Sequence, residues 1–431
     1  MSIKKRISYS FLTHLIYKFS FIISPIILFP LIINNLGTEI FKFWISINSI
    51  LIFIFANDFG IGMSKLMELN EYLKKDISIF KRNINTLLNF KVSLYLGYIA
   101  LIFIIIFFFK IKVIFILLIT SVIYQSINHI SIVLSHALWA SGKNWIIYLI
   151  NGIGQILEII IFLILFFILD LEIKSFIAFP ILSILRFLFL ILIVHKLKLF
   201  NYDFNFDKDF LFSKKKGIFG FIFETLSSNT KFHLLRFLLG IILSGFKFTQ
   251  ITILFTLANF SKNICASLSQ IIFPELNHII KNLNKFKEYS IEYIRFGFYF
   301  NLIICSFFLF FGEKLTDLWL SNSSFFDKKL FIIILSIVFI KNFNELIAYV
   351  YQSVNKHLSY YSIYLSLLIS SLVLFLITKD IVTLLSSYLF IECMMIFLNF
   401  YFLNRLLNIN NIFEIFSFSK FIKSSFRYIT D

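Results

Sequence analysis

The sequence predicts an all-α polytopic membrane protein with about twelve transmembrane helices in two six-helix lobes. Of the 431 residues, 59% are hydrophobic and 15% are charged, whereas soluble domains carry about 25% charged residues. The apolar residues fall in many runs of roughly 18 to 25, the length that a helix needs to cross a bilayer. Turn residues are scarce, with 13 Gly and 4 Pro, which excludes an outer-membrane barrel with its frequent turns.

Polar breaks between the apolar runs define the twelve predicted helices. The first run is too long for a cleaved signal peptide, so we interpret it as a retained helix. The polar break at 201–216 separates six helices from six, which predicts a first lobe at 1–200, a linker at 201–216, a second lobe at 217–404 and a tail at 405–431. The predicted helices cover residues 11–33, 43–59, 92–109, 113–138, 146–169, 175–194, 218–237, 246–273, 294–311, 330–351, 359–377 and 381–403.

The basic character of the chain predicts its orientation. The formal net charge is +17, which in a soluble protein suggests nucleic acid but here follows from the excess of Lys and Arg in cytoplasmic loops of membrane proteins. With the N-terminus inside, the predicted inner segments hold 24 Lys and Arg and the outer segments hold 9. We therefore predict cytoplasmic N- and C-termini and no nucleic-acid partner. Both halves then begin on the same side, an arrangement typical of transporters.

Sequence motifs of catalysis and metal binding are absent. The three cysteines, Cys265, Cys305 and Cys393, have no CxxC spacing and no adjacent histidine cluster, so neither a disulfide framework nor a zinc site is indicated. The sequence contains no GxxxxGK[ST], HExxH or GxSxG motif, which argues against an ATPase, a zinc protease and a serine hydrolase. We predict no enzymatic activity, no cofactor and no metal site.

Charged residues inside the predicted helices are the candidate functional residues, since a charge at membrane depth is costly and usually faces a protein cavity. Cations outnumber acids among them, which favours an anionic solute in a hydrated cavity between the two lobes. The alternative is that the cations extend to the nearest lipid headgroups. The candidate cargo-binding cations are Lys18, Arg186, Lys231, Arg236 and Lys262. Polar stripes on the fourth and eighth helices extend the predicted cavity: Ser121, Gln125, Asn128 and His129, and Asn259, Asn263, Ser267 and Gln270.

Four acidic residues in the predicted helices are candidates for ion coupling: Asp58, Glu158, Glu345 and Glu392. Glu158 and Glu392 each lie in an apolar run with no charged neighbour in sequence, which is consistent with either proton coupling or a neutral structural role. Glu345 lies four residues after Lys341, and this spacing predicts an ion pair between them on one helix face.

Several loose motifs, in order along most of the chain, resemble bacterial O-antigen and polysaccharide flippases. Near the N-terminus, Pro30, Leu36-Gly37 and Trp44 precede the stretch at residues 57–62, Asn-Asp-Phe-Gly-Ile-Gly. Further matches are Ala137-x2-Ala140-Ser141-Gly142-Lys143, Leu257-Ala258-Asn259-x10-Gln270-x3-Pro274-Glu275-Leu276, Gly312-x6-Trp319-Leu320 and Asn355-Lys356-His357. These flippases belong to the multidrug/oligosaccharidyl-lipid/polysaccharide exporter superfamily.

The resemblance implies two lobes around a cationic cavity, alternating access, and transfer of an undecaprenyl-pyrophosphate-linked oligosaccharide from the inner to the outer leaflet of the bacterial cytoplasmic membrane. It also implies partners among membrane lipids and other polysaccharide-assembly membrane proteins. One departure is that the chain has only seven Arg, so Lys replaces much of the basic character. Two alternatives stay open: a cation-coupled multidrug exporter of the same superfamily, which favours an acidic cavity, and a membrane-embedded glycan polymerase or ligase, which requires a large outer catalytic loop.

Overall fold

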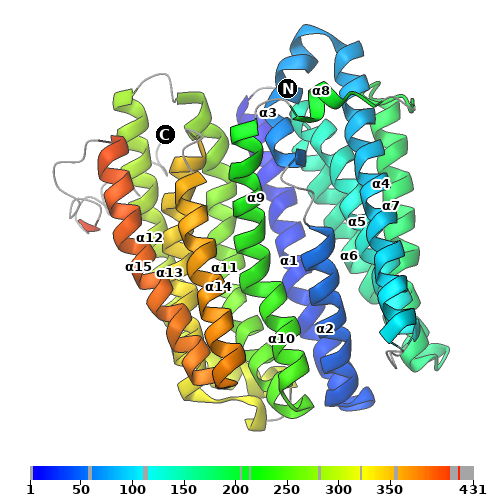
Figure 1. Ribbon diagram of the computed structural model, residues 1–431, viewed down its shortest axis with the longest axis vertical. Coiled ribbons are helices and arrows are strands. Elements are labelled where there is room, and N and C mark those ends of the chain that lie inside the picture. The colour runs from blue at the N-terminus through cyan, green and yellow to red at the C-terminus, as the bar shows by residue number, and fades with distance from the viewer. Residues whose placement is uncertain are drawn as a thin grey trace. The chain divides into compact units, whose positions relative to one another are not determined.

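The computed structural model describes residues 3–56, 61–109, 115–203, 206–212, 215–279, 283–320, 323–353, 358–407 and 416–417. All regular secondary structure in these ranges is helical (Figure 1), which confirms the predicted all-α class. Ten helices in this described part are long and apolar enough to cross a membrane, and they correspond to predicted helices one to six and nine to twelve. The chain is therefore a multi-pass membrane protein.

The seventh and eighth predicted helices are helical but do not meet the same length and apolarity criteria. The seventh is divided into α9 (Lys215–Asn229), the π-helical turn η3 (Thr230–Leu234) and α10 (Leu235–Ile242). The eighth is the single helix α11 (Gly245–Ile279), which carries Lys247 and Lys262. Both segments combine cations with polar residues, which lowers their hydropathy below that of an ordinary lipid-facing helix.

The chain forms two compact units that meet in sequence after Phe246. In unit 1, the helix pairs α1 with α6 and α5 with α7 make the most extensive contacts. Unit 1 contains α1 (Ile3–Leu36), α2 (Thr38–Phe55), α3 (Ile61–Lys75), α4 (Ile77–Phe109), α5 (Phe115–Ala140), α6 (Asn144–Leu163), the π-helical turn η1 (Ile164–Ile168), the 3-10 helix η2 (Glu172–Ile177), α7 (Ala178–Lys196), α8 (Lys208–Phe212), α9, η3 and α10.

Unit 2 is built around α13, whose apolar window is 61% buried, against 33% for each of the other three candidate membrane helices of this unit. It contains most of α11 together with α12 (Leu283–Leu320), the 3-10 helix η4 (Ser323–Phe325), α13 (Lys328–Ser353), α14 (Leu358–Thr378) and α15 (Ile381–Leu407). Helices α12 and α15 both pack on α13, and α14 packs on α15 (Figure 1). The burial of α13 explains why polar residues on this helix need partners inside the protein.

The sequence places the seventh helix in the second lobe, whereas the structure packs it within unit 1. Helix α9 contacts α3, and both η3 and α10 contact α2. The connection to α11 is fixed at Gly245, whose backbone N–H donates to Glu39 Oε1 over 2.8 Å. A Cβ at this position would lie 2.4 Å from Glu39 Oε1, so glycine permits the close approach. The boundary between the two compact units lies after Phe246.

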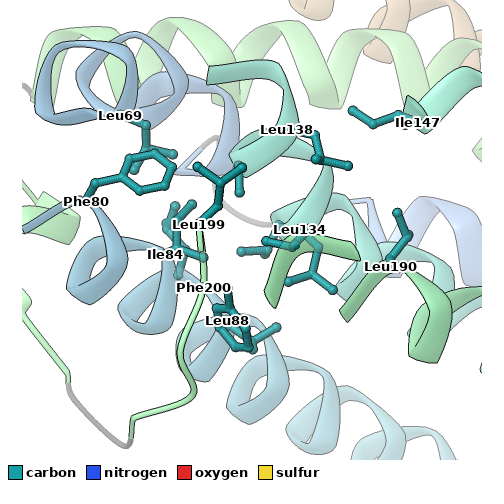
Figure 2. Close-up of a cluster of buried hydrophobic side chains, with 14 of the residues drawn as sticks. Leu69, Phe80, Ile84, Leu88, Leu134, Leu138, Ile147, Leu190, Leu199 and Phe200 are labelled. Carbon is teal, nitrogen blue, oxygen red and sulfur yellow. The ribbon is translucent and has the colours of Figure 1, made fainter. Parts of the chain in front are cut away.

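Apolar residues just before and within the predicted linker at 201–216 belong to the hydrophobic core of unit 1. Leu199 and Phe200 are buried in a cluster to which α3, α4, α5 and α7 contribute. Figure 2 shows both side chains among Ile84, Leu88 and Leu134. Phe210 and Leu211 of α8 join the same cluster. Burial of these four apolar side chains against unit 1 anchors the segment by the hydrophobic effect.

A row of polar side chains on α4 binds the same segment. Asn85 Nδ2 donates to the Asn201 carbonyl over 2.7 Å, and Asn89 Nδ2 donates to the Asp203 carbonyl over 3.3 Å. The Asp207 backbone N–H donates to Thr86 Oγ1 over 3.2 Å. Helix α4 therefore begins at Ile77, well before the apolar run that starts at Val92. The polar side chains of its first half are hydrogen-bonded to protein groups, so this part of the helix does not have to be apolar.

Asp207 joins this row to α8, and its replacement by Ala is expected to loosen the segment. Its Oδ1 accepts from the Phe210 N–H over 2.9 Å, and its Oδ2 accepts from Arg82 Nη2 over 3.0 Å. Losing the α8 cap is expected to cost about 1 kcal/mol and to increase the rate of limited proteolysis within residues 201–212 several-fold. Asp209→Ala, an exposed neighbour, is the control. Equal cleavage rates for both variants contradict the anchoring role of Asp207.

Aspartates also begin three long helices. Asp76 Oδ1 accepts from both the hydroxyl and the N–H of Ser78 at the start of α4, each over 2.7 Å. Asp380 Oδ2 accepts from the Thr383 hydroxyl and N–H at the start of α15, over 2.6 and 2.9 Å. These hydrogen bonds, the side-chain ones foremost, hold the pKa of Asp76 and of Asp380 below its ordinary value. Asp327 caps α13 in the same way through the Leu330 N–H.

Candidate functional site

The charged interior of unit 1 contains a buried ion pair between α6 and α7. Arg186 Nη2 lies 2.9 Å from Glu158 Oε1, and the two side chains are 10% and 3% exposed. The same guanidinium nitrogen donates to Asn128 Oδ1 of α5 over 2.7 Å, and the Tyr124 hydroxyl donates to Glu158 Oε2 over 3.3 Å. A Cβ on Gly154 would lie 3.0 Å from Arg186 Cδ, so the glycine makes room for the arginine.

The structure corrects the interpretation of Glu158 as an acid without a charged partner. Its partner lies 28 residues away in sequence, on the neighbouring helix, which is why the sequence around Glu158 does not indicate it. The pair leaves little net charge at this point of unit 1. Cargo binding by Arg186 and ion coupling by Glu158, both predicted from the sequence, stay predictions.

Lys18 lies on α1, next to a group of aromatic side chains at the contact between α1 and α6. Its ammonium group is 6.0 Å from the centroid of the Tyr17 ring. The buried His14 ring contacts Tyr148 of α6 edge-on, with centroids 4.5 Å apart. Helices α1 and α6 approach closely because residue 152 is glycine: a Cβ there would lie 3.1 Å from Tyr17 Cα.

Two predicted cargo-binding cations lie in and just after the π-helical turn in unit 1. Lys231 lies within η3 and is buried, and Arg236 follows in the first turn of α10, where it is partly buried. Among the residues that the structure describes, no ion pair or hydrogen bond of the Arg236 guanidinium is found. A π-helical turn inside an α-helix frequently marks a functional site, and this one shifts the register of the helix between the two cations.

In unit 2, one carboxylate lies between two lysines. Glu345 Oε1 is 3.1 Å from Lys341 Nζ on the same helix, α13, and 3.6 Å from Lys262 Nζ of α11. The predicted ion pair between Lys341 and Glu345 is confirmed. Since two ammonium groups share one carboxylate, these three side chains carry one surplus positive charge. Lys262 therefore lies in a cationic environment, whereas Glu345 is neutralised.

Glu392 lies in a hydrogen-bond network that links α13, α14 and α15 of unit 2. It is 1% exposed, and its Oε1 accepts from the Tyr364 hydroxyl over 2.5 Å. Asn344 Nδ2 donates to Glu392 Oε2 over 2.9 Å and to the Glu392 carbonyl over 3.0 Å. Asn399 Nδ2 donates in turn to Asn344 Oδ1 over 2.8 Å, and the Tyr351 hydroxyl donates to the Asn399 carbonyl. Neutral donors from α13 and α14 thus hold this carboxylate.

The remaining acidic candidate, Asp58, lies outside the described residues. Sequence reasoning missed Asn344, Tyr364 and Asn399, which bind Glu392 or one another. Their signal is an amide or hydroxyl in an otherwise apolar run, since a buried polar group requires a partner. In the described part of the chain, no group of three or more His, Cys, Asp or Glu is placed to hold a metal ion.

Comparison with known proteins shows which fold these sites belong to. No protein family matches the sequence, and no curated protein matches it either. Solved structures do match over nearly the whole chain. A Vibrio cholerae MATE transporter, VcmN in the bent form, has a TM-score of 0.65 at 14% identity, over 94% of this chain and 97% of that one.

Two further structures agree. An outward-facing multidrug resistance MATE family transporter of the MOP superfamily has a TM-score of 0.66 at 13% identity, over 94% of this chain and 96% of that chain. A MATE in the straight conformation has a TM-score of 0.65 at 12% identity over the same shares. The chain therefore has the two-lobed fold of MATE transporters, which confirms the fold that the sequence resemblance implied.

Proposed function

We propose that this protein is a transporter that moves an anionic, lipid-linked oligosaccharide from the inner to the outer leaflet of the bacterial cytoplasmic membrane by alternating access. The fold supports membrane transport in general. The anionic cargo is supported by one observation above the others: Lys231 lies within a π-helical turn and Arg236 follows it by two residues, in a segment that the sequence predicts to cross the membrane. Lys and Arg bind phosphate oxygens, and a pyrophosphate linkage supplies several of them.

Undecaprenyl-pyrophosphate is the carrier that the sequence resemblance implies, with an O-antigen or capsule repeat unit as its glycan. A partly buried guanidinium at membrane depth is unfavourable without an anion, so cargo binding at Arg236 would offset its desolvation. Arg also binds phosphate through two parallel hydrogen bonds, whereas Lys acts as a point charge. Arg236 is thus the residue at which the proposal is tested most sharply.

Replacing Arg236 with Gln is expected to slow flipping about ten- to hundredfold, since a hydrogen bond to a charged group contributes about 1.5–3 kcal/mol. The measurement is translocation of a fluorescent undecaprenyl-pyrophosphate glycan in proteoliposomes. Arg236→Lys is expected to retain part of the activity. Arg405→Gln, at an exposed arginine near the end of α15, is the control and is expected to flip at the parental rate. Parental flipping by Arg236→Gln would overturn the anionic-cargo proposal.

A cation-coupled multidrug exporter is the second candidate, because one of the matched structures is a multidrug resistance transporter. The two functions are distinguished by expressing the chain in a drug-hypersensitive host and in a host that lacks its polysaccharide flippase. Drug resistance without restored surface glycan favours the exporter. Restored surface glycan, together with less lipid-linked precursor on the inner leaflet, favours the flippase.

For energy coupling, we place the coupling carboxylate at Glu392. Glu158 and Glu345 are engaged in ion pairs, which stabilise their charged forms. Glu392 accepts hydrogen bonds from the neutral groups of Tyr364 and Asn344. A hydroxyl and an amide adapt to a protonated or an ionised carboxyl at lower cost than a fixed cation does, because each donor can reorient or accept.

A further inference from the structure

Two thiols of unit 2 contact the same oxygen atom. Cys265 Sγ of α11 lies 3.5 Å from Asn301 Oδ1, and Cys305 Sγ of α12 lies 3.4 Å from the same atom. Cys265 is 5% exposed, Cys305 is 6% and Asn301 is fully buried. The separation of the two sulfurs cannot exceed the sum of these two contacts.

The shared oxygen cannot satisfy every donor that approaches it. Asn342 Nδ2 of α13 also donates to Asn301 Oδ1, over 2.9 Å, and a carbonyl oxygen has two lone pairs for three donors. The amide makes the short contact, and the thiols make long ones, as expected for weak S–H donors. Cys305 also approaches Ser261 Oγ at 3.7 Å. Both thiols are thus buried with weak hydrogen bonds and remain available for a stronger partner.

We propose that Cys265 and Cys305 form a two-thiolate site for a soft monovalent d10 cation of the Cu⁺ and Ag⁺ class, which joins α11 to α12. Soft thiolate ligands select such cations over Na⁺ or Mg²⁺. With metal–sulfur bonds of about 2.3 Å, a linear site holds the sulfurs about 4.6 Å apart, within the limit that the Asn301 contacts set. On binding, each thiol loses its proton, so two protons are released and the complex carries one negative charge.

The neighbouring charges suit that product. Lys262 lies three residues before Cys265 on α11, and Lys341 precedes the Asn342 that binds Asn301. Lys262, Lys341 and Glu345 together carry one surplus positive charge, which balances the single negative charge of the dithiolate complex. The site does not depend on the transported cargo, so it stands independently of the proposed function.

Silver binding to the purified full-length chain tests the proposal. The third cysteine, Cys393, is replaced by Ser first, because α15 carries it at a partly exposed position. The Cys393→Ser chain is expected to retain one Ag⁺ per protein after desalting and to release two protons per ion. Adding Cys265→Ser or Cys305→Ser is expected to weaken Ag⁺ binding at least about a hundredfold, since one of two metal ligands is lost. Excess Na⁺ or Mg²⁺ should not compete.

X-ray absorption at the silver edge gives a second readout that needs no further substitution. Two sulfur neighbours at one distance in the Cys393→Ser chain support the site. One sulfur with oxygen or nitrogen neighbours overturns it, as do equal Ag⁺ affinities before and after the loss of either thiol. Size-exclusion profiles of the variants separate a lost ligand from a misfolded chain, and the absorption spectrum decides the matter where a variant misfolds.

Discussion

Replacing Arg186 with Met is expected to lower the free energy of unfolding by about 3–5 kcal/mol, as for other buried ion pairs that lose one partner. The substitution removes the cation but leaves Glu158, 3% exposed, buried without its counter-charge. Asn128 also loses a hydrogen bond, because its Oδ1 accepts from Arg186 Nη2 in the parent protein. The measurement is unfolding of the purified protein by SDS titration, compared with the parent chain.

The matched control is Arg405→Met, an exposed arginine, which is expected to change stability by no more than about 0.5 kcal/mol. The double variant Arg186→Met with Glu158→Leu removes both charges and is expected to recover most of the loss, since apolar replacement of a buried pair is often neutral. A double variant as unstable as Arg186→Met alone would contradict the assignment of the loss to an unpaired carboxylate.

Replacing Glu392 with Gln is expected to reduce transport driven by a proton gradient at least about tenfold, because glutamine keeps the shape of the side chain but carries no titrating proton. Transport is measured in proteoliposomes with and without an imposed pH gradient. The stability of the fold is expected to change little. The Tyr364 hydroxyl can still donate to the glutamine oxygen, and about one hydrogen bond is lost where the glutamine amide nitrogen faces the Asn344 amide nitrogen.

Two comparisons separate coupling from structure. Tyr364→Phe removes the donor to Glu392 Oε1 but leaves the carboxyl, so it is expected to retain gradient-driven transport at a reduced rate. Exchange of cargo without a gradient is expected to persist in Glu392→Gln. Gradient-driven transport at the parental rate in Glu392→Gln would move the coupling site elsewhere in the chain.

The sequence predicts the helices of this protein better than it predicts the side-chain contacts between them. Long apolar runs locate ten membrane helices, and the spacing of Lys341 and Glu345 predicts their pair because four residues is one helical turn. The pair of Glu158 with Arg186 is different. It joins two helices, and no periodicity within either helix reveals which face meets which neighbour.

Polar segments whose partners lie far away in the chain carry no local signal of their structure. The stretch around 201–211 reads as a linker because Asn201, Asp203 and Asp207 interrupt the apolar pattern. In the structure the carbonyls of Asn201 and Asp203 accept from α4, and Asp207 caps α8. Their few apolar neighbours, such as Leu199 and Phe200, are too short a run to indicate a core contribution. The polar first half of α4 lies outside the predicted helix at 92–109 for the same reason: its partners lie more than a hundred residues later.

The burial of Leu199, Phe200, Phe210 and Leu211 in unit 1 has a consequence for biosynthesis. Every buried member of that cluster precedes residue 219 in the chain, so all of them leave the ribosome before α11 is made. Chains are synthesised from the N-terminus and domains fold as units during synthesis. This cluster can thus close while the second half of the chain is still being translated.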